Sequence, residues 1–166
     1  MAKPHIPERP TPPRFFELRI EVVDAPIPLW RRALVPPHVP LPLMSELLAT
    51  LFSREDSIDQ FRFVRGGVSW EIPWPLVETA SLDAYHAVLA DGLAEPRDVL
   101  RYEDDWGGLW RLDLHLERVR TVADLLPDRV VVLDGAGAPP PCYVGDMEEY
   151  GECLAILADP LHPMHS

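Results

Sequence analysis

Two segments alternate apolar and polar residues with a period of two, and this constrains the fold more than any other feature of the chain. In residues 109–118 tryptophan and leucine occupy every second position, with charged residues and a histidine between them. Residues 15–22 repeat the alternation from Phe16 onward. Successive side chains of a strand point to opposite faces, so each segment predicts a strand with one buried face.

Further strand-like segments follow one another as hairpins. Gly66-Gly67 separates two of them, and Asp105-Trp106-Gly107-Gly108 separates two more. Glycine pairs at such positions are typical of tight turns, because glycine adopts positive φ without steric strain. We expect strands over residues 15–22, 27–35, 59–65, 68–72, 98–105, 109–118 and 130–133.

Three segments predict helices. Residues 41–52 place leucine, methionine and phenylalanine on one face at 3.6 residues per turn, and Pro42 suits a first helical turn. Residues 81–91 predict a short helix that begins at Ser81 and ends at Gly92, and residues 146–158 predict a last one.

In the last predicted helix, Asp146 and Glu149 have the spacing of a capping box, and Tyr150, Leu154 and Leu157 form the apolar face. Because the strands come in hairpins rather than in βαβ order, we predict the α+β class. The expected fold is a mixed, mostly antiparallel sheet built from hairpins, with about three helices packed on it.

Proline occurs 20 times and marks the expected boundaries. Groups of prolines exclude helix interiors and central strands. We expect residues 1–13 to form a flexible proline-rich arm, residues 14–160 a single domain, and residues 161–166 a loose tail.

The charge balance is acidic, with 15 Lys and Arg against 27 Asp and Glu and a formal net charge of −12. Such a field repels phosphate backbones and makes nucleic-acid binding unlikely, whereas it favours solubility or a basic protein partner. No apolar run approaches the roughly 18 to 20 residues of a membrane helix, and the first residues lack a signal-peptide core. We therefore expect a cytoplasmic protein that does not enter a membrane, with two reduced cysteines.

The chain lacks the common catalytic and phosphate-binding motifs, including the glycine-rich nucleotide loops and the G-x-S-x-G elbow. His162 and His165 are spaced like metal ligands, but Pro163 between them argues against a regular helical pair. We interpret the carboxylates of residues 103–105 and 146–149 as a solvated turn and a helix N-terminus. The residues therefore predict no catalytic group, no metal and no cofactor.

Three motifs follow one another along the chain. The first is Pro28, Trp30, Arg31 and Arg32, followed by Val35-Pro36 and the helical segment. The second comprises Tyr102, Asp105, Trp106, Gly107 and Trp110. The third runs from Leu133-Asp134-Gly135 through a proline-rich loop and Tyr150 to Asp159-Pro160, His162 and Pro163. Together they cover about residues 15–163, and their order and spacing resemble those of the plasmid pRiA4b ORF-3-like family.

The resemblance implies a compact α+β fold in a bacterial protein that is often associated with plasmids and insertion elements. This chain departs from the family pattern where relatives carry polar residues. Asp59 stands where relatives have a histidine, Gly108 replaces an aspartate, and Leu112 replaces a second histidine. The scaffold residues remain while potentially reactive ones are lost, which argues against an enzyme.

We therefore expect a non-catalytic binding or accessory module linked to mobile elements, with a protein partner. The candidate binding residues are Trp30, Arg31, Arg32, Asp105, Trp106 and Trp110. A plainer interpretation makes Trp30 and Trp110 core anchors and pairs the arginines with nearby carboxylates. Two other hypotheses are a metal-dependent hydrolase that uses Asp105, His115 and the carboxylates near Asp146, and a nucleic-acid-binding passenger protein of an insertion element.

Overall fold

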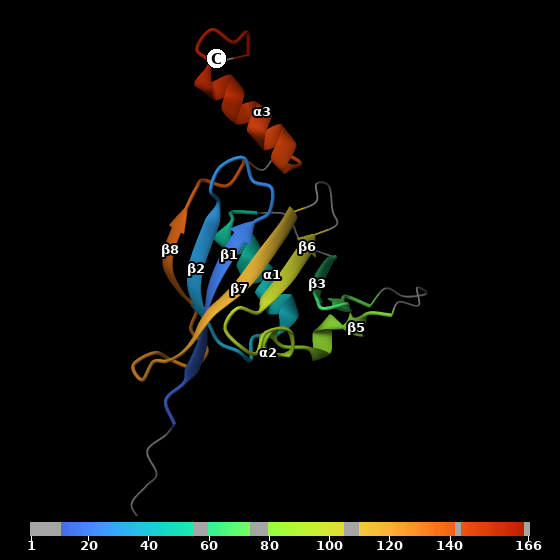
Figure 1. The fold of residues 1–166 in the computed structure, drawn as a ribbon, viewed down its shortest axis with the longest axis vertical. Helices are drawn as coiled ribbons and strands as arrows, with labels where there is room; N and C mark the ends of the chain where they lie inside the picture. Colours follow the sequence, from blue (N-terminus) through green and yellow to red (C-terminus); the bar gives the residue numbers. More distant parts are fainter. Residues whose placement is uncertain (1–10, 55–59, 74–79, 105–109, 142–143, 165–166) are drawn as a thin grey trace, which may run out of the picture.

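The protein folds around one eight-stranded sheet, seen in a computed structural model that describes residues 11–54, 60–73, 80–104, 110–141 and 144–164 (Figure 1). The strands are β1 (Arg14–Val22), β2 (Trp30–Val35), β3 (Phe61–Arg65), β4 (Val68–Glu71), β5 (Leu82–Asp83), β6 (Val99–Asp104), β7 (Trp110–Thr121) and β8 (Val131–Ala136). The helices are α1 (Leu41–Leu51), α2 (Leu89–Gly92) and α3 (Met147–Ala158), with a 3-10 turn η1 (Ala84–His86).

The strand order across the sheet is β5-β4-β3-β6-β7-β1-β2-β8. All pairs are antiparallel except β4 with β5, which is parallel. The predicted α+β class, with a mixed and mostly antiparallel sheet, is confirmed. The strands at 14–22, 61–65, 68–71, 99–104 and 110–121 arise where the sequence pattern predicts them.

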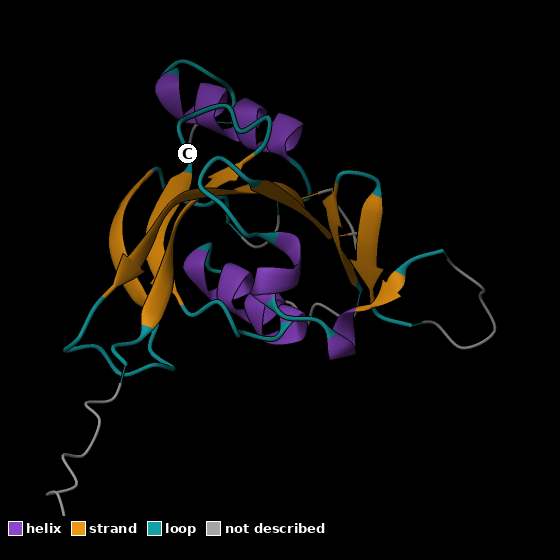
Figure 2. Cartoon of the chain, turned by 60° about the horizontal axis from the view of Figure 1, so that its bottom comes forward, coloured by secondary structure: helices purple, strands orange, loops and turns teal. Residues whose placement is uncertain are grey.

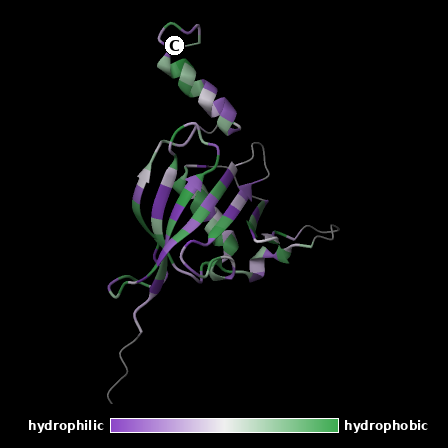
Figure 3. Cartoon of the chain, in the orientation of Figure 1, coloured by the Kyte–Doolittle hydropathy of each residue, from purple (hydrophilic) through white to green (hydrophobic). Residues whose placement is uncertain are grey.

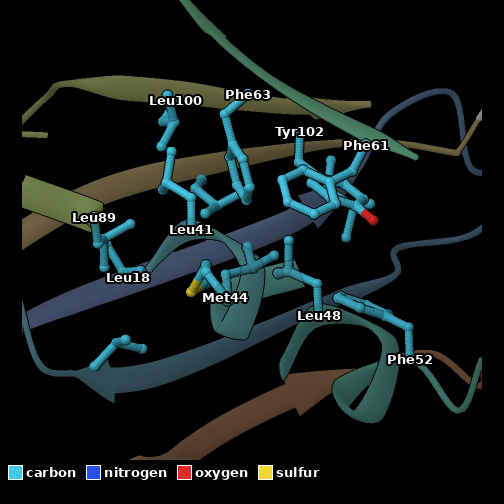
Figure 4. Close-up of a cluster of buried hydrophobic side chains, with 14 of the residues drawn as sticks. Leu18, Leu41, Met44, Leu48, Phe52, Phe61, Phe63, Leu89, Leu100 and Tyr102 are labelled. Carbon is cyan, nitrogen blue, oxygen red and sulfur yellow. The ribbon is translucent and has the colours of Figure 1, made fainter. Parts of the chain in front are cut away.

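The curved sheet wraps one face around α1 and leaves the other face open (Figure 2). Leu18 and Leu100 reach from the sheet toward Met44 and Leu48 of the helix (Figure 4). These side chains are at most 2% exposed, as the period-two and period-3.6 patterns require. The core therefore lies between α1 and the inner face of the sheet.

The β3–β4 hairpin turns at the predicted glycine pair. Gly66 and Gly67 have φ values of 56° and 84°, in the region that side chains with a Cβ rarely adopt. On its other side β4 pairs with the short strand β5, where Trp70 lies opposite Leu82. The prediction of a hairpin over these residues is confirmed.

The prediction of one helix over residues 81–91 is wrong. The segment divides into β5, η1 and α2 because its backbone groups bond to distant partners. Ala87 O accepts the Leu41 N–H at 3.0 Å, and the Leu89 N–H donates to Val39 O at 2.9 Å. Asp83 accepts the Tyr85 N–H and caps the 3-10 turn, so Ser81 is not the N-cap.

The last strand is longer than predicted. The predicted strand ends at Leu133, but β8 continues through Asp134 and Gly135 and pairs with β2 as far as Ala136. A register shift opposite Arg32 and Ala33 accommodates one extra residue of β8. Val132 and Leu133 remain exposed at this edge of the sheet.

Asp146 is the N-cap of α3, as its spacing predicts, but Glu149 reaches back to Gly145 rather than to Asp146, so the predicted capping box forms only in part. The Asp146 carboxylate accepts the Glu149 N–H at 2.8 Å, while the Glu149 carboxylate accepts the Gly145 N–H at 2.7 Å. The predicted apolar face is only partly buried, since Tyr150 lies in the core and Leu157 is exposed. The helix stands beyond the end of the sheet (Figure 1).

The predicted division into arm, domain and tail stays a prediction, because residues 1–10 and 165–166 lie outside the described part of the chain. Within that part, no helix combines the length and the apolar character that crossing a bilayer requires.

Candidate functional site

The open face of the sheet carries a lattice of paired charges. Figure 3 shows hydrophilic and hydrophobic positions alternating along the strands of the sheet. The polar residues that alternate with the core residues of β1, β2, β3, β6 and β7 all project to this side. The pairs are Arg19 with Glu21, Arg32 with Glu117, Arg62 with Glu103, Arg101 with Asp113, and Arg111 with Asp24. Positive and negative charges therefore balance locally across this face.

Trp30 lies on the same face, at the end of the sheet where β1 turns into β2. Its ring is partly exposed, and the Arg19 guanidinium stacks over it with its central carbon 4.0 Å from the ring centroid. Arg32 approaches the same ring at 5.8 Å. An aromatic ring attracts cations through the negative charge of its π face, so this arrangement is a cation–aromatic platform.

A hollow of about 400 Å³ opens beside this platform. Arg19, Glu21 and Asp24 supply its charged lining, and the loop that joins β1 to β2 supplies Pro26 and Pro28. The volume falls within the range of ordinary ligand sites. Among the predicted binding residues that the structure describes, Trp30 is the one that lines it.

Arg32 lies next to the hollow but is held by carboxylates. Its Nε and Nη2 donate to Glu117 at 2.7 and 3.1 Å, and Glu17 lies 4.0 Å away. The hydrogen bond and the charge of Glu117 raise the pKa of Arg32. Arg32 therefore remains charged and fixed in orientation, in agreement with the plainer interpretation of this arginine.

Arg31 points to the opposite face and clamps the backbone. Its guanidinium donates to Leu51 O at 3.2 Å, to Trp30 O at 2.8 Å, to Ala136 O at 2.9 Å and to Gly137 O at 3.2 Å. One side chain thus joins the C-terminal end of α1 to β2 and β8. A cation at that end also interacts favourably with the helix dipole.

Trp110 and Asp104 belong to the core. Trp110 is 4% exposed, and Arg54 stacks 4.8 Å from its ring centroid. Asp104 is 2% exposed, and its Oδ2 lies 2.6 Å from Nη1 of Arg54 in an ion pair. Sequence reasoning selected the neighbouring Asp105 as a candidate. Its interpretation of the carboxylates of residues 103–105 as a solvated turn is wrong for Asp104, which lies buried at the end of β6. Asp105 and Trp106 lie outside the described residues.

Tyr102 joins this buried polar cluster from β6. Its hydroxyl lies 3.1 Å from the hydroxyl of Ser45 on α1, and both residues are buried. Burial raises the pKa of the Tyr102 hydroxyl above its ordinary value of 10. The folded protein therefore keeps the Tyr102 hydroxyl neutral and hydrogen-bonded.

We expect Tyr102→Phe to lower the free energy of unfolding by about 1 kcal/mol at pH 7, because Ser45 loses its partner. Because the pKa is raised in the folded state, the stability from neutral Tyr102 is complete below pH 10. It is lost as the pH rises from there toward the folded pKa. The deficit of the variant should therefore shrink above pH 10. Urea unfolding of both proteins from pH 7 to 11 measures this, and a constant deficit would contradict it.

The described residues of the metal-dependent hydrolase hypothesis do not lie together. His115 lies 3.7 Å from Glu21 on the open face, whereas Asp146 caps α3 at its N-terminus. Within the described residues, no three His, Cys, Asp or Glu side chains are grouped closely enough to hold a metal ion. His162 is described and accepts the Met164 N–H, while His165 lies outside the described part.

Comparison with known proteins gives a family and a fold. The crystal structure of a protein of unknown function, MM3350 from Methanosarcina mazei Go1, superposes with a TM-score of 0.74. It shares 20% sequence identity, and the similarity covers 90% of this chain and 84% of that chain. No curated protein matches the chain. A family model described as plasmid pRiA4b ORF-3-like protein matches residues 14–166, and the chain therefore belongs to this family.

Proposed function

We propose that this protein is a non-catalytic binding module that captures a basic segment of a partner protein in the hollow beside Trp30. The observation that carries the proposal is the partly exposed Trp30 ring, which holds a guanidinium at 4.0 Å within a hollow of about 400 Å³. Aromatic rings at such positions are frequent anchors in protein interfaces.

The charges around the hollow support a cationic ligand. Glu21 and Asp24 line it with side chains that are 40% and 66% exposed. Their present partners Arg19 and Arg111 form surface ion pairs, each contributing about 0–1 kcal/mol. Exchange of these arginines for cations of a partner therefore costs little, and the net charge of −12 attracts such a partner at long range.

The same lattice of charges supports protein binding over nucleic-acid binding. An arginine can bind a phosphate only after it gives up any bond to a competing carboxylate. Arg32 and Arg101 each bond a carboxylate through two nitrogens, so neither is available for a phosphate at low cost. The loss of a family histidine at Leu112 further supports a non-catalytic role, because this leucine is 2% exposed in the core.

The accessory role linked to mobile elements is part of this proposal. It predicts that the captured protein is encoded near this chain on a plasmid or an insertion element. Native purification from the source cell at modest salt, followed by mass spectrometry, identifies the captured protein and tests this link.

Trp30→Ala should reduce capture of the partner at least tenfold, because it removes the aromatic platform. The measurement is the amount of partner retained from source-cell extract by immobilised wild-type protein and by the variant. Arg19→Ala should retain the partner, because it exposes the ring face without removing the ring.

Tyr85→Ala is the matched control, since Tyr85 is 61% exposed and η1 lies outside the hollow. It should capture the partner as the wild-type protein does. Equal retention by the wild-type, Trp30→Ala and Tyr85→Ala proteins would refute binding at Trp30. Retention that disappears after nuclease treatment would favour a nucleic-acid ligand instead.

A further inference from the structure

Helix α3 is anchored to the body through its first half. Met147 and Tyr150 are 9% and 4% exposed, and the Tyr150 hydroxyl donates to Ala138 O at 2.8 Å. Cys153 and Leu154 are partly buried against the same core. The helix lies beyond the end of the sheet and points away from it (Figure 1).

One apolar stripe continues past this anchored half. Met147, Tyr150, Leu154 and Leu157 recur at intervals of three and four residues along α3, and Leu161 and Met164 follow in the turns after the helix ends at Ala158. These six residues are the apolar stripe. The last three, at the C-terminal end of the stripe, are 68%, 92% and 70% exposed. Figure 3 shows this change from polar to apolar along α3. The body therefore covers the beginning of the stripe and leaves its end in solvent.

We infer that a second copy of this chain covers the exposed end of the stripe. Residues 153–164 carry a single formal charge, at Asp159, whereas the whole chain carries −12. Two copies can thus meet here with little local repulsion. A basic partner would find few carboxylates to pair with, so the charge pattern favours a second copy over a cationic protein.

An antiparallel arrangement of the two helices follows from the remaining charges. The acidic residues of α3 lie in its first half, at Glu148, Glu149 and Glu152. A two-fold axis near Leu157 places these acidic turns at opposite ends of the helix pair and brings the two apolar ends together. The helix of 12 residues spans about 18 Å, which keeps the two acidic groups well apart.

The exposed area predicts a weak dimer. Burial of three large apolar side chains removes roughly 300 Å² per copy from water, and roughly 600 Å² for the pair. This is about half of what a stable interface buries, so we expect a dissociation constant in the micromolar to millimolar range.

Sedimentation equilibrium of the full chain tests the inference. Between 0.05 and 0.5 M NaCl the association should strengthen several-fold, because salt screens the repulsion between two copies of charge −12. Leu157→Gln combined with Leu161→Gln should weaken it at least tenfold without adding charge. Tyr85→Gln is the matched control, with a side chain that is 61% exposed on η1, and should associate as the wild-type protein does.

Circular dichroism verifies that the variants keep the fold, as expected for substitutions in solvent. A monomeric mass at about 1 mM protein in 0.5 M NaCl would overturn the inference. Association that persists unchanged in the double variant, or that weakens with salt, would overturn it as well.

Discussion

Asp104→Ala is expected to lower the free energy of unfolding by about 3 kcal/mol, because it leaves the Arg54 guanidinium buried without its counter-ion. The side chain of Arg54 is 16% exposed and that of Asp104 is 3% exposed, so water can replace little of the lost interaction. Trp110 and Tyr102 line the same small cavity and would lose packing support. Urea unfolding followed by tryptophan fluorescence measures the change.

A second variant separates the buried charge from the loss of packing. Arg54→Met combined with Asp104→Leu removes both charges and keeps apolar volume, and should recover most of the stability lost in Asp104→Ala. A loss below about 1 kcal/mol in Asp104→Ala would contradict a structural role of the pair. Glu103→Ala is the control on the opposite face, where its partner Arg62 is half exposed and the expected loss is at most about 1 kcal/mol.

Arg31→Ala is expected to lower the free energy of unfolding by about 2–3 kcal/mol, because hydrogen bonds from a charged donor contribute about 1.5–3 kcal/mol. The substitution removes the bonds that join Leu51 O at the end of α1 to Ala136 O on β8. Thermal and urea unfolding measure the loss. Arg31→Lys should recover part of it, since one ammonium can reach some of these carbonyl groups.

The control for Arg31 is Arg62→Ala, which removes a half-exposed ion pair from the open face and should change the stability by at most about 1 kcal/mol. Equal stability of the Arg31→Ala and wild-type proteins would contradict the role of Arg31 as a clamp. This role also changes the interpretation of binding variants. Lost capture in Arg31→Ala would report a loosened fold, whereas lost capture in Trp30→Ala would report the site.

Local patterns predicted the elements that rely on local interactions. The alternation in β1 and β7, the apolar face of α1 and the glycine turn of the β3–β4 hairpin were all readable from neighbouring residues. The prediction for residues 81–91 failed because Ala87 and Leu89 bond to residues at the start of α1 and just before it, about fifty residues earlier in the chain. No local pattern contains those partners.

The sequence analysis predicted part of the site. The polar residues whose roles it did not predict lie at strand positions that face inward. Asp104 shares the inward face of β6 with Leu100 and Tyr102, so strict alternation along this strand would have predicted a buried carboxylate, whereas we interpreted it as part of a solvated turn. Arg31 likewise shares the inward face of β2 with Ala33 and Val35. The hollow beside Trp30 had no signal of its own, because it forms only where the turn between β1 and β2 brings Asp24 and Pro28 beside Arg19.

The most direct test of the binding module is the indole N–H signal of Trp30 in a proton–nitrogen NMR spectrum during titration with the captured partner. Comparison with Trp30→Phe assigns this signal among those of the five tryptophans. We predict that it shifts or broadens in proportion to the partner bound, together with backbone signals of Arg19 and Asp24. A partner that binds at saturating concentration while the Trp30 signal stays unchanged would contradict the proposed site.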